Sequence, residues 1–258
     1  MGDWTAIVLA GQRPGENDFA ASYGLAAKAL IPVDGEAMLS RVAKTLLASP
    51  SVGRVIVMAQ DAQALFTGDA AWLAAEERVT TAGAGEGISD SVEAVAGTQV
   101  APWPVLVTTA DHPLLRPEMV EAFIAGSAGA DSTFGMVERK IVEQVHPETK
   151  RTWIKFSDGH YTGANLFALV TEDSRPGIQF WSRAERDRKK ALRLLWFFGP
   201  AIFLRAFTRT VSLDGAAAMA ARKLKLRLRV VKLPFPEAAI DVDKPADLEL
   251  AERILKAR

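Results

Sequence analysis

The sequence contains no cysteine, which excludes disulfides, cysteine-ligated zinc sites and thiol nucleophiles. It also lacks a long apolar run. The longest one, residues 194–204, contains Gly199-Pro200 and falls well short of the roughly 20 residues that span a bilayer. The first residues lack the cationic region of a secretory signal. We therefore expect a cytoplasmic protein.

There is no excess charge of either sign. Lys and Arg together number 31, as do Asp and Glu, so no overall field attracts nucleic acid or a membrane. A basic partner site would have to be local, and we expect no nucleic-acid partner. Hydrophobic residues make up 49% of the 258 residues, enough for the core of one large α/β domain or two small ones.

Short apolar runs alternate with helical patterns along the chain. The predicted strands are Thr5–Ala10, Arg54–Met58, Val105–Thr109 and Asn165–Val170. The predicted helices are Met38–Ala48, Ser89–Ala96 and Pro117–Ala125. Each of the first three strands is followed by a loop and then a helix, which is typical of βαβ units in a parallel sheet covered on both faces.

The pattern loosens from about residue 134. Residues 143–150 are predicted to be a turn, and residues 155–160 resemble a hairpin tip. We interpret about 134–223 as a substrate-facing insertion in a single domain of residues 1–258. Beyond it, the alternation in 224–230 predicts a strand, and a terminal helix is expected to run through about Lys256.

The loop after the first strand, residues 9–15, reads Leu-Ala-Gly-Gln-Arg-Pro-Gly. A glycine-rich turn there lets backbone N–H groups approach a phosphate, while Arg13 and Lys28 neutralise its charge. The spacing fits neither a dinucleotide-binding fingerprint nor a Walker A loop. The alternative is an ordinary βα turn with Lys28 solvated.

The apolar strand Val105–Thr109 ends close to Asp111, His112 and Pro113. Ligands of parallel α/β sheets bind beyond the carboxyl ends of the strands, so Asp111 is predicted to face the ligand. Its carboxylate suits Mg²⁺, which commonly binds one or two carboxylates together with substrate phosphates. The alternatives are a helix cap for Asp111 and a simple turn for His112.

Asp241 and Asp243 stand two residues apart in a segment that precedes a proline-started helix. On an extended backbone, such a spacing directs both carboxylates to the same side. The alternative is that one of them caps the helix. Only a pairing with Asp111 would favour a metal-binding role.

A second glycine-rich loop contains Gly83, Gly85 and Gly87, followed by Ser89 and Ser91. Glycines at alternate positions let a backbone lie against a flat base, and a serine is predicted to cap the helix that follows. The alternative is a flexible connection.

Together these segments resemble the MobA-like nucleotidyltransferases, which belong to the glycosyltransferase-A-like superfamily. The matching residues are Leu9, Ala10, Gly11, Gln12, Arg13, Gly15, Lys28, Leu30, Gly35, Met38 and Leu39, then Thr109–Leu115, Thr162–Phe167 and Asp241–Leu248. The resemblance covers about residues 4–170 and 224–256. The spacing from Gly15 to Lys28 is longer than in the compact family loop, which leaves an insertion or a different lysine as alternatives.

The resemblance implies a three-layer α/β/α Rossmann-like (GT-A-like) domain with a mixed, mostly parallel central sheet. It implies transfer of a nucleoside monophosphate group from an NTP, CTP or GTP, to a phosphorylated small-molecule acceptor, with release of pyrophosphate and dependence on Mg²⁺. The acceptor phosphate is already a nucleophile, so this chemistry needs no general base and gives His112 no necessary task.

The family pattern also implies the roles of individual residues. The catalytic residues would be Arg13, Lys28 and Asp111. The nucleotide-binding residues would be Leu9, Ala10, Gly11, Gln12, Gly15, Lys28, Gly83, Gly85, Gly87 and Ser91. Gly163 and Asn165 would contact the acceptor. Mg²⁺ would be held by Asp111 and Asp243, with Asp241 as the alternative second ligand.

Residues 183–209 join a cationic segment to an aromatic one, with eight basic residues against two acidic ones. Such a segment would suit peripheral contact with an anionic membrane. Packing of its aromatic residues on the sheet and a dimer contact are the alternatives. The basic residues Lys225, Arg227 and Arg229 would extend the same face or protect a strand edge.

Two other classes of function are weighed against the nucleotidyltransferase. A metal-dependent nucleotide-sugar glycosyltransferase of GT-A-like fold would carry a compact Asp-x-Asp near the middle of the chain and would not need the loop at 9–15. A non-catalytic nucleotide-binding module would not need Arg13, Lys28, Asp111 and Asp243 together.

Overall fold

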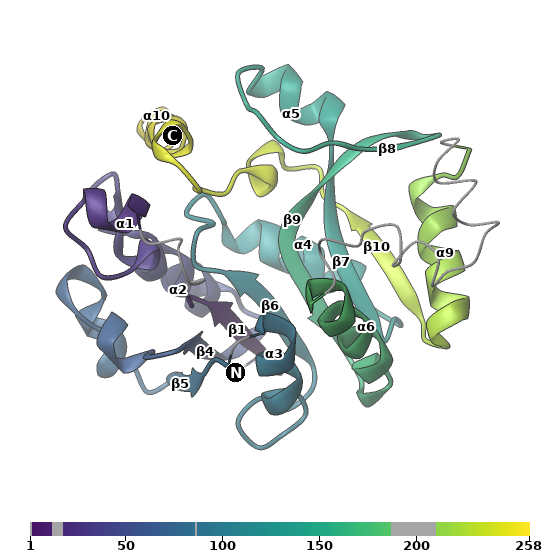
Figure 1. Ribbon diagram of the computed structural model, residues 1–258, viewed down its shortest axis with the longest axis horizontal. Coiled ribbons are helices and arrows are strands. Elements are labelled where there is room, and N and C mark those ends of the chain that lie inside the picture. The colour runs from purple at the N-terminus through teal and green to yellow at the C-terminus, as the bar shows by residue number, and fades with distance from the viewer. Residues whose placement is uncertain (1, 12–17, 86, 187–209) are drawn as a thin grey trace.

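The computed structural model of the chain describes residues 2–11, 18–85, 87–186 and 210–258. Within them an eight-stranded sheet has the order β10-β7-β9-β6-β1-β4-β5, with β8 paired to β9 (Figure 1). Its strands are β1 (Trp4–Leu9), β4 (Val52–Ala59), β5 (Val79–Gly83), β6 (Val105–Thr109), β7 (Ser132–Glu138), β8 (Ile154–Phe156), β9 (Gly159–Leu169) and β10 (Leu228–Lys232).

β1 lies in the middle of a parallel group, between β4 and β6. Its residues Ala6, Ile7 and Val8 are fully buried, because helices cover both faces of this part of the sheet. β9 pairs antiparallel with both β6 and β7. The predicted fold class, an α/β/α domain with a mixed and mostly parallel sheet, is confirmed.

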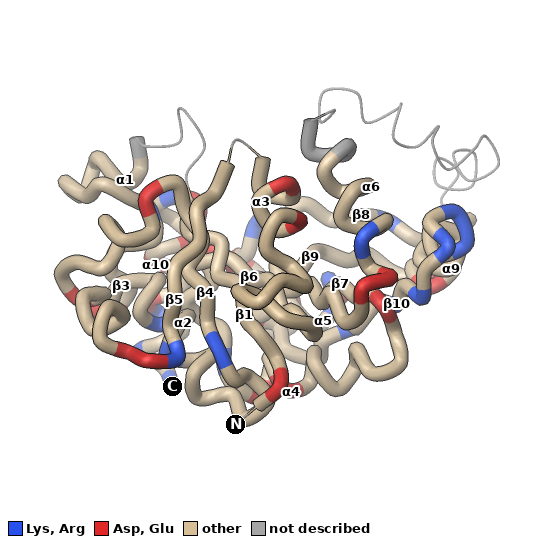
Figure 2. The backbone as a smooth tube through the Cα atoms, turned by 90° about the horizontal axis from the view of Figure 1, so that it is seen from below, with Lys and Arg blue, Asp and Glu red and all other residues tan. Residues whose placement is uncertain are grey.

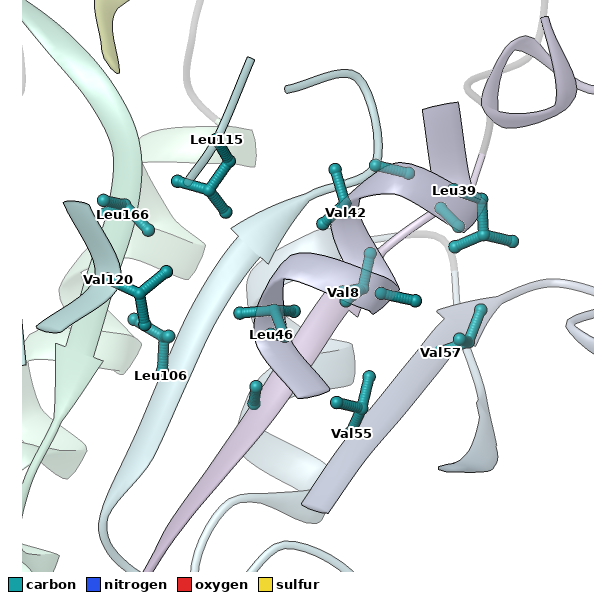
Figure 3. Close-up of a cluster of buried hydrophobic side chains, with 14 of the residues drawn as sticks. Val8, Leu39, Val42, Leu46, Val55, Val57, Leu106, Leu115, Val120 and Leu166 are labelled. Carbon is teal, nitrogen blue, oxygen red and sulfur yellow. The ribbon is translucent and has the colours of Figure 1, made fainter. Parts of the chain in front are cut away.

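Helices α2 (Met38–Ala48) and α4 (Pro117–Gly126) pack on one face of the sheet, in the largest hydrophobic cluster. Figure 3 shows Leu39, Val42 and Leu46 of α2 directed at the strands, as their helical spacing predicts. All three are fully buried. Truncating a leucine such as Leu46 to alanine would therefore cost about 2–5 kcal/mol.

The opposite face is covered by α3 (Ile88–Val95) and α6 (Arg175–Arg186), which also contact each other. Val92 of α3 and Ile178 of α6 belong to one buried cluster with Ile7 and Val107 of the sheet. α9 (Leu213–Leu224) packs beside β10 at one end of the sheet (Figure 1). The sheet is thus a rigid support that is buried from both sides.

Seven of the remaining elements lie toward the edge of the sheet where β1 and β6 end. They are α1 (Asp18–Ser22), the short helix η1 (Lys28–Leu30), the hairpin β2 (Pro32–Val33) and β3 (Glu36–Ala37), α5 (Arg139–Val145), η6 (Pro236–Ala239) and α10 (Pro245–Lys256). The hairpin turns through Asp34 and Gly35, whose φ angles of 52° and 79° are left-handed, as a tight two-residue turn requires.

Most predicted elements agree with the observed ones to within a few residues, but the strand predicted at Asn165–Val170 begins six residues earlier, at Gly159. The predicted strand 224–230 is wrong at its start, since α9 continues through Leu224 and β10 begins only at Leu228. Ser212 caps the start of α9, and its hydroxyl accepts a hydrogen bond from Gly215 N. Lys225 follows its last residue with a left-handed φ of 56°. Alternation of leucine with basic residues therefore misplaced the boundary.

Much of the predicted insertion at 134–223 completes the central sheet, because β7 and β9 lie within it. The predicted hairpin at 155–160 is confirmed by β8 and β9. The predicted turn at 143–150 begins inside α5, which ends at Val145. Most of the cationic and aromatic block 183–209 lies outside the described residues. No helix in the part of the chain that the structure describes is long and apolar enough to cross a membrane.

Candidate active site

Several predicted site residues meet at one edge of the sheet. Leu9 pairs with Met58 and with Thr109, so β1, β4 and β6 end level with one another. Asp111 follows directly on that edge. β9 runs the other way, and its Phe167 pairs with Val107. Residues of β9 that precede Phe167 therefore lie progressively nearer the edge where β6 ends. Asn165 and Gly163 are among them.

Lys28 joins the two carboxylates that the sequence assigned to the metal. Its Nζ lies 2.5 Å from Asp111 Oδ2 and 2.8 Å from Asp243 Oδ1. Burial opposes the charge on Lys28, but the ion pairs and hydrogen bonds with both aspartates outweigh it and raise the pKa of Lys28 above its ordinary value. The long spacing from Gly15 thus does not keep Lys28 from this edge.

The backbone fixes the two aspartates relative to each other. Val242 N donates a hydrogen bond of 2.8 Å to Asp111 O, and Asp247 Oδ2 accepts one of 3.2 Å from Asp243 N. Neither aspartate is a helix cap, since α4 and α10 have Arg116 and Lys244 at their N-caps and no side-chain cap bond. Both carboxylates are therefore free of the capping role that was the alternative.

Asp241 faces a different set of partners. Its carboxylate pairs with Nη1 of Arg151 and accepts a hydrogen bond of 2.8 Å from Asn165 Nδ2. Burial, the largest cause, raises the pKa of Asp241, and Arg151 opposes that effect. Asp241 and Asp243 therefore bind different partners. Residues 240–244 form no strand, so the two-residue period from which we expected both to point the same way does not apply.

His112 is fully buried beside this cluster. The backbone of Glu237 acts on the imidazole as a hydrogen-bond partner, and together with Asp111 it opposes the effect of burial on the pKa. Burial is the main cause that lowers the pKa of His112 to about 4, so the imidazole is neutral near pH 7. A neutral, enclosed ring agrees with chemistry that assigns this residue no proton transfer.

The second glycine-rich loop is organised by Ser91. Its hydroxyl accepts a hydrogen bond of 2.8 Å from Gly85 N and donates one of 2.6 Å to Gly87 O. The expected serine cap is wrong, since Gly87 is the N-cap of α3 without a side-chain cap bond, and Ser89 lies inside the helix. Ser91 instead turns back onto the loop and fixes its backbone.

Two glycines at this edge face open space. A Cβ at Gly83, which ends β5, or at Gly163 of β9 would meet no atom within 4 Å. Gly11 is exposed and follows β1, with Leu9 and Ala10 before it. The predicted residues Gln12, Arg13 and Gly15 lie outside the described residues, so the structure does not place them.

The donor set at Asp111 suits a divalent cation that also binds phosphates. Asp111 Oδ1 is buried and has no hydrogen-bond partner in the described part of the chain. The Asp243 side chain is 61% exposed, so it is open to a ligand. Within the described residues no group of three or more His, Cys, Asp or Glu could hold a metal. Two carboxylates are what Mg²⁺ uses when phosphates supply further ligands.

Sequence reasoning missed Arg151. It lies between α5 and β8, next to the turn predicted at 143–150, and its partner Asp241 is 90 residues away. No local pattern marks such a residue. The available signal was indirect, because a buried aspartate near a site needs a cation or several donors.

Paired carboxylates and a bridging lysine thus lie at the carboxyl edge of a mixed α/β/α sheet, the place where such sheets bind ligands. The chain belongs to the MobA-like NTP transferase domain family, whose pattern matches residues 6–155. A search of curated proteins gives no match.

Several solved structures share the fold of this chain. A hypothetical transferase from Thermus thermophilus is 28% identical, with a TM-score of 0.80 over 96% of this chain and 100% of its own. A 4-diphosphocytidyl-2C-methyl-D-erythritol synthase from Anaerococcus prevotii is 11% identical, with a TM-score of 0.59 over 99% and 96%. A CMP:2-keto-3-deoxy-manno-octonic acid synthetase complexed with CTP is 15% identical, with a TM-score of 0.57 over 98% of each chain. The last two show likeness of fold alone.

Proposed function

We propose that this protein transfers a nucleoside monophosphate group from an NTP to a phosphorylated small-molecule acceptor and releases pyrophosphate, with Mg²⁺ as cofactor. The observation that carries the proposal is the contact of Lys28 with both Asp111 and Asp243. It brings together residues from three distant parts of the chain at the edge where α/β proteins bind phosphates. The match to the MobA-like family supports the same reaction class.

In this reaction an oxygen of the acceptor phosphate attacks the α-phosphorus of the NTP. The bond from that phosphorus to the bridging oxygen breaks, and pyrophosphate leaves with the electron pair. Since the attacking oxygen is already an anion, the protein's task is to align it with the leaving group and to neutralise charge. Mg²⁺ held by Asp111 and Asp243 would supply positive charge to the phosphate oxygens.

The chain's own residues divide between the two substrates. Lys28 and Arg13 would neutralise the pyrophosphate, with backbone N–H groups of the loop at 9–15. The loop at 83–87 would lie against the base, its backbone held by Ser91. Gly163 and Asn165 would contact the acceptor from β9.

We take CTP as the first nucleotide to test and GTP as the second. A fold neighbour is complexed with CTP, and another is a diphosphocytidyl synthase. The backbone of a glycine-rich loop suits either base, so the choice requires measurement.

We propose that the protein is cytoplasmic. The block 183–209 is proposed to make a peripheral contact with anionic membrane, and a dimer contact is the competing role. Co-sedimentation with liposomes that contain anionic lipid tests the membrane contact. Salt-sensitive binding would support it, and its absence together with a dimer in solution would favour the competing role.

The test of the proposed function is a pyrophosphate-release screen of four NTPs, with Mg²⁺, against phosphorylated alcohols, phosphorylated sugars and molybdopterin. One acceptor is expected to release pyrophosphate and to form the matching nucleotidyl product. Asp111→Asn should abolish this release, while Asp3→Asn, a change of an exposed aspartate at the start of the chain, should not. Release of pyrophosphate without an acceptor-derived product would contradict the proposal.

A further inference from the structure

Arg151 is bound to Asp241 through both of its terminal nitrogens. Nη1 pairs with the carboxylate, and Nη2 donates a hydrogen bond of 2.8 Å to the backbone oxygen. The Arg151 side chain is only 11% exposed. Asn165 Nδ2 occupies the other carboxylate oxygen at 2.8 Å. Each carboxylate oxygen of Asp241 therefore has a hydrogen-bond partner other than Lys28.

Asp241 is linked through the backbone to both proposed metal ligands. The next residue, Val242, donates its N–H to Asp111 O. The one after it is Asp243, which contacts Lys28. Fixing both the side chain and the carbonyl of Asp241 therefore fixes the segment that presents Asp243 beside Asp111.

Three carboxylates meet at this place. Val242, which stands between Asp241 and Asp243, donates its N–H to Asp111 O, and Lys28 contacts both Asp111 and Asp243. Lys28 is shared by two of them, so Arg151 is the cation that compensates the third. Removing Arg151 would leave a largely buried carboxylate uncompensated, and it would turn toward the nearest cation.

We propose that Arg151 is a positioning residue, which holds Asp241 away from the cation position so that only Asp111 and Asp243 face it. The inference rests on the proposed function and identifies which of the two closing aspartates is a ligand. Arg151 acts through Asp241, because its guanidinium binds both the carboxylate and the backbone oxygen of that residue and its side chain is only 11% exposed.

The experiment is a double-mutant cycle of Arg151→Gln, Asp241→Asn and the double variant in the full chain. The readouts are Mn²⁺ affinity, measured by electron paramagnetic resonance as a substitute for Mg²⁺, and the kcat of pyrophosphate release. Thermal unfolding identifies variants that fail to fold. Arg139→Gln is the matched control, since that arginine pairs with Glu143 on α5 outside the site.

Arg151→Gln is expected to bind Mn²⁺ about tenfold more tightly and to turn over more slowly, because a third carboxylate joins the ion and displaces it. In the Asp241→Asn background the same substitution should change Mn²⁺ affinity by less than about twofold. General structural damage would weaken Mn²⁺ binding in both backgrounds. Tighter Mn²⁺ binding with slower turnover therefore distinguishes a loss of positioning from structural damage.

The proposal is overturned if Arg151→Gln leaves Mn²⁺ affinity unchanged or weakens it, or if its effect is equal in both backgrounds. A wild-type protein that binds Mn²⁺ but transfers no nucleotide would contradict the proposed function alone. The double-mutant cycle on Mn²⁺ affinity would still support or overturn the role of Arg151.

Discussion

Lys28 places its ammonium 2.5 Å from the carboxylate of Asp111, although the two residues are 83 positions apart. The same ammonium also contacts Asp243. A protein cation thus lies between the two oxygens that we propose as ligands of a divalent cation. Lys28 and the divalent cation would compete for these oxygens until the phosphates of an NTP give the lysine another partner.

Lys28→Met should therefore make stability depend on divalent ions. Without them, Asp111 and Asp243 lose their shared cation, and the free energy of unfolding should fall by about 1–3 kcal/mol. Mg²⁺ should restore that loss by binding the folded state. Thermal melts with and without MgCl₂ measure the difference.

The control for this change is Lys44→Met, which removes a lysine whose Nζ lies 2.7 Å from Glu36 on the surface. Its melting temperature should respond to Mg²⁺ as that of the wild type does. An equal response of Lys28→Met and the wild type would show that the lysine and the ion do not share the carboxylates.

Asp243→Asn should lower kcat about 100-fold, the order of effect of removing one charge-stabilising group from an active site. It should also raise the Mg²⁺ concentration required for half-maximal turnover. The control is Glu249→Gln, an exposed position on the following helix α10. Assays of pyrophosphate release over a range of Mg²⁺ test this. Normal turnover together with an unchanged half-maximal Mg²⁺ concentration would exclude Asp243 as a ligand.

Gly83→Ala and Gly163→Ala should each affect the binding of a different substrate. Because an added Cβ meets no protein atom within 4 Å at either position, both variants should keep the wild-type melting temperature. Gly83→Ala should raise the KM for the NTP, and Gly163→Ala that for the acceptor. Steady-state kinetics with one substrate varied at a time separates the two effects. A shared effect on the same KM would show that one glycine has been assigned to the wrong substrate.

The Asp131–Arg227 pair should control acid stability away from the site. Hydrogen bonds from Arg227 are the main cause that lowers the pKa of Asp131 to about 2, against an opposing effect of burial. A carboxyl with a lowered folded-state pKa stabilises the fold above its unfolded-state pKa of about 4. That contribution is lost as the pH falls from about 4 to about 2.

Asp131→Asn should therefore reduce the free energy of unfolding at neutral pH by about 1–3 kcal/mol and flatten its dependence below pH 4. Urea unfolding at several pH values measures both effects. Asp173→Asn, an exposed change in the same region, serves as the control. If the free energy of unfolding of Asp131→Asn falls below pH 4 as steeply as that of the wild type, other carboxyls cause the loss of stability in acid.

The sequence was informative where a single local pattern decides the structure. β1 and β6 are continuous apolar runs because both faces of the sheet are covered, and α2 follows its helical spacing from Met38 to Ala48. The family pattern also led to Lys28, Asp111 and Asp243, which the structure brings together. Their proposed roles await the experiments above.

The sequence was misleading or silent where distant segments decide the structure. Asp241 binds Arg151 and Asn165, which are 90 and 76 residues away, whereas Asp243 binds Lys28. Ser91 binds a loop carbonyl in place of capping α3, because the chain folds back at Gly85. The end of α9 at Lys225 likewise depends on a left-handed backbone that alternation of leucine and basic residues does not reveal.

The hydrogen bond from Val242 to Asp111 has a consequence for synthesis of the protein. Translation delivers the chain in order, and 215 residues separate Lys28 from Asp243. The parallel core of β1, β4 and β6 can collapse on the ribosome long before the segment at 241–243 emerges, and contacts of such separation form late. A nascent chain would therefore present Lys28 and Asp111 without the second proposed carboxylate until residue 243 has been made.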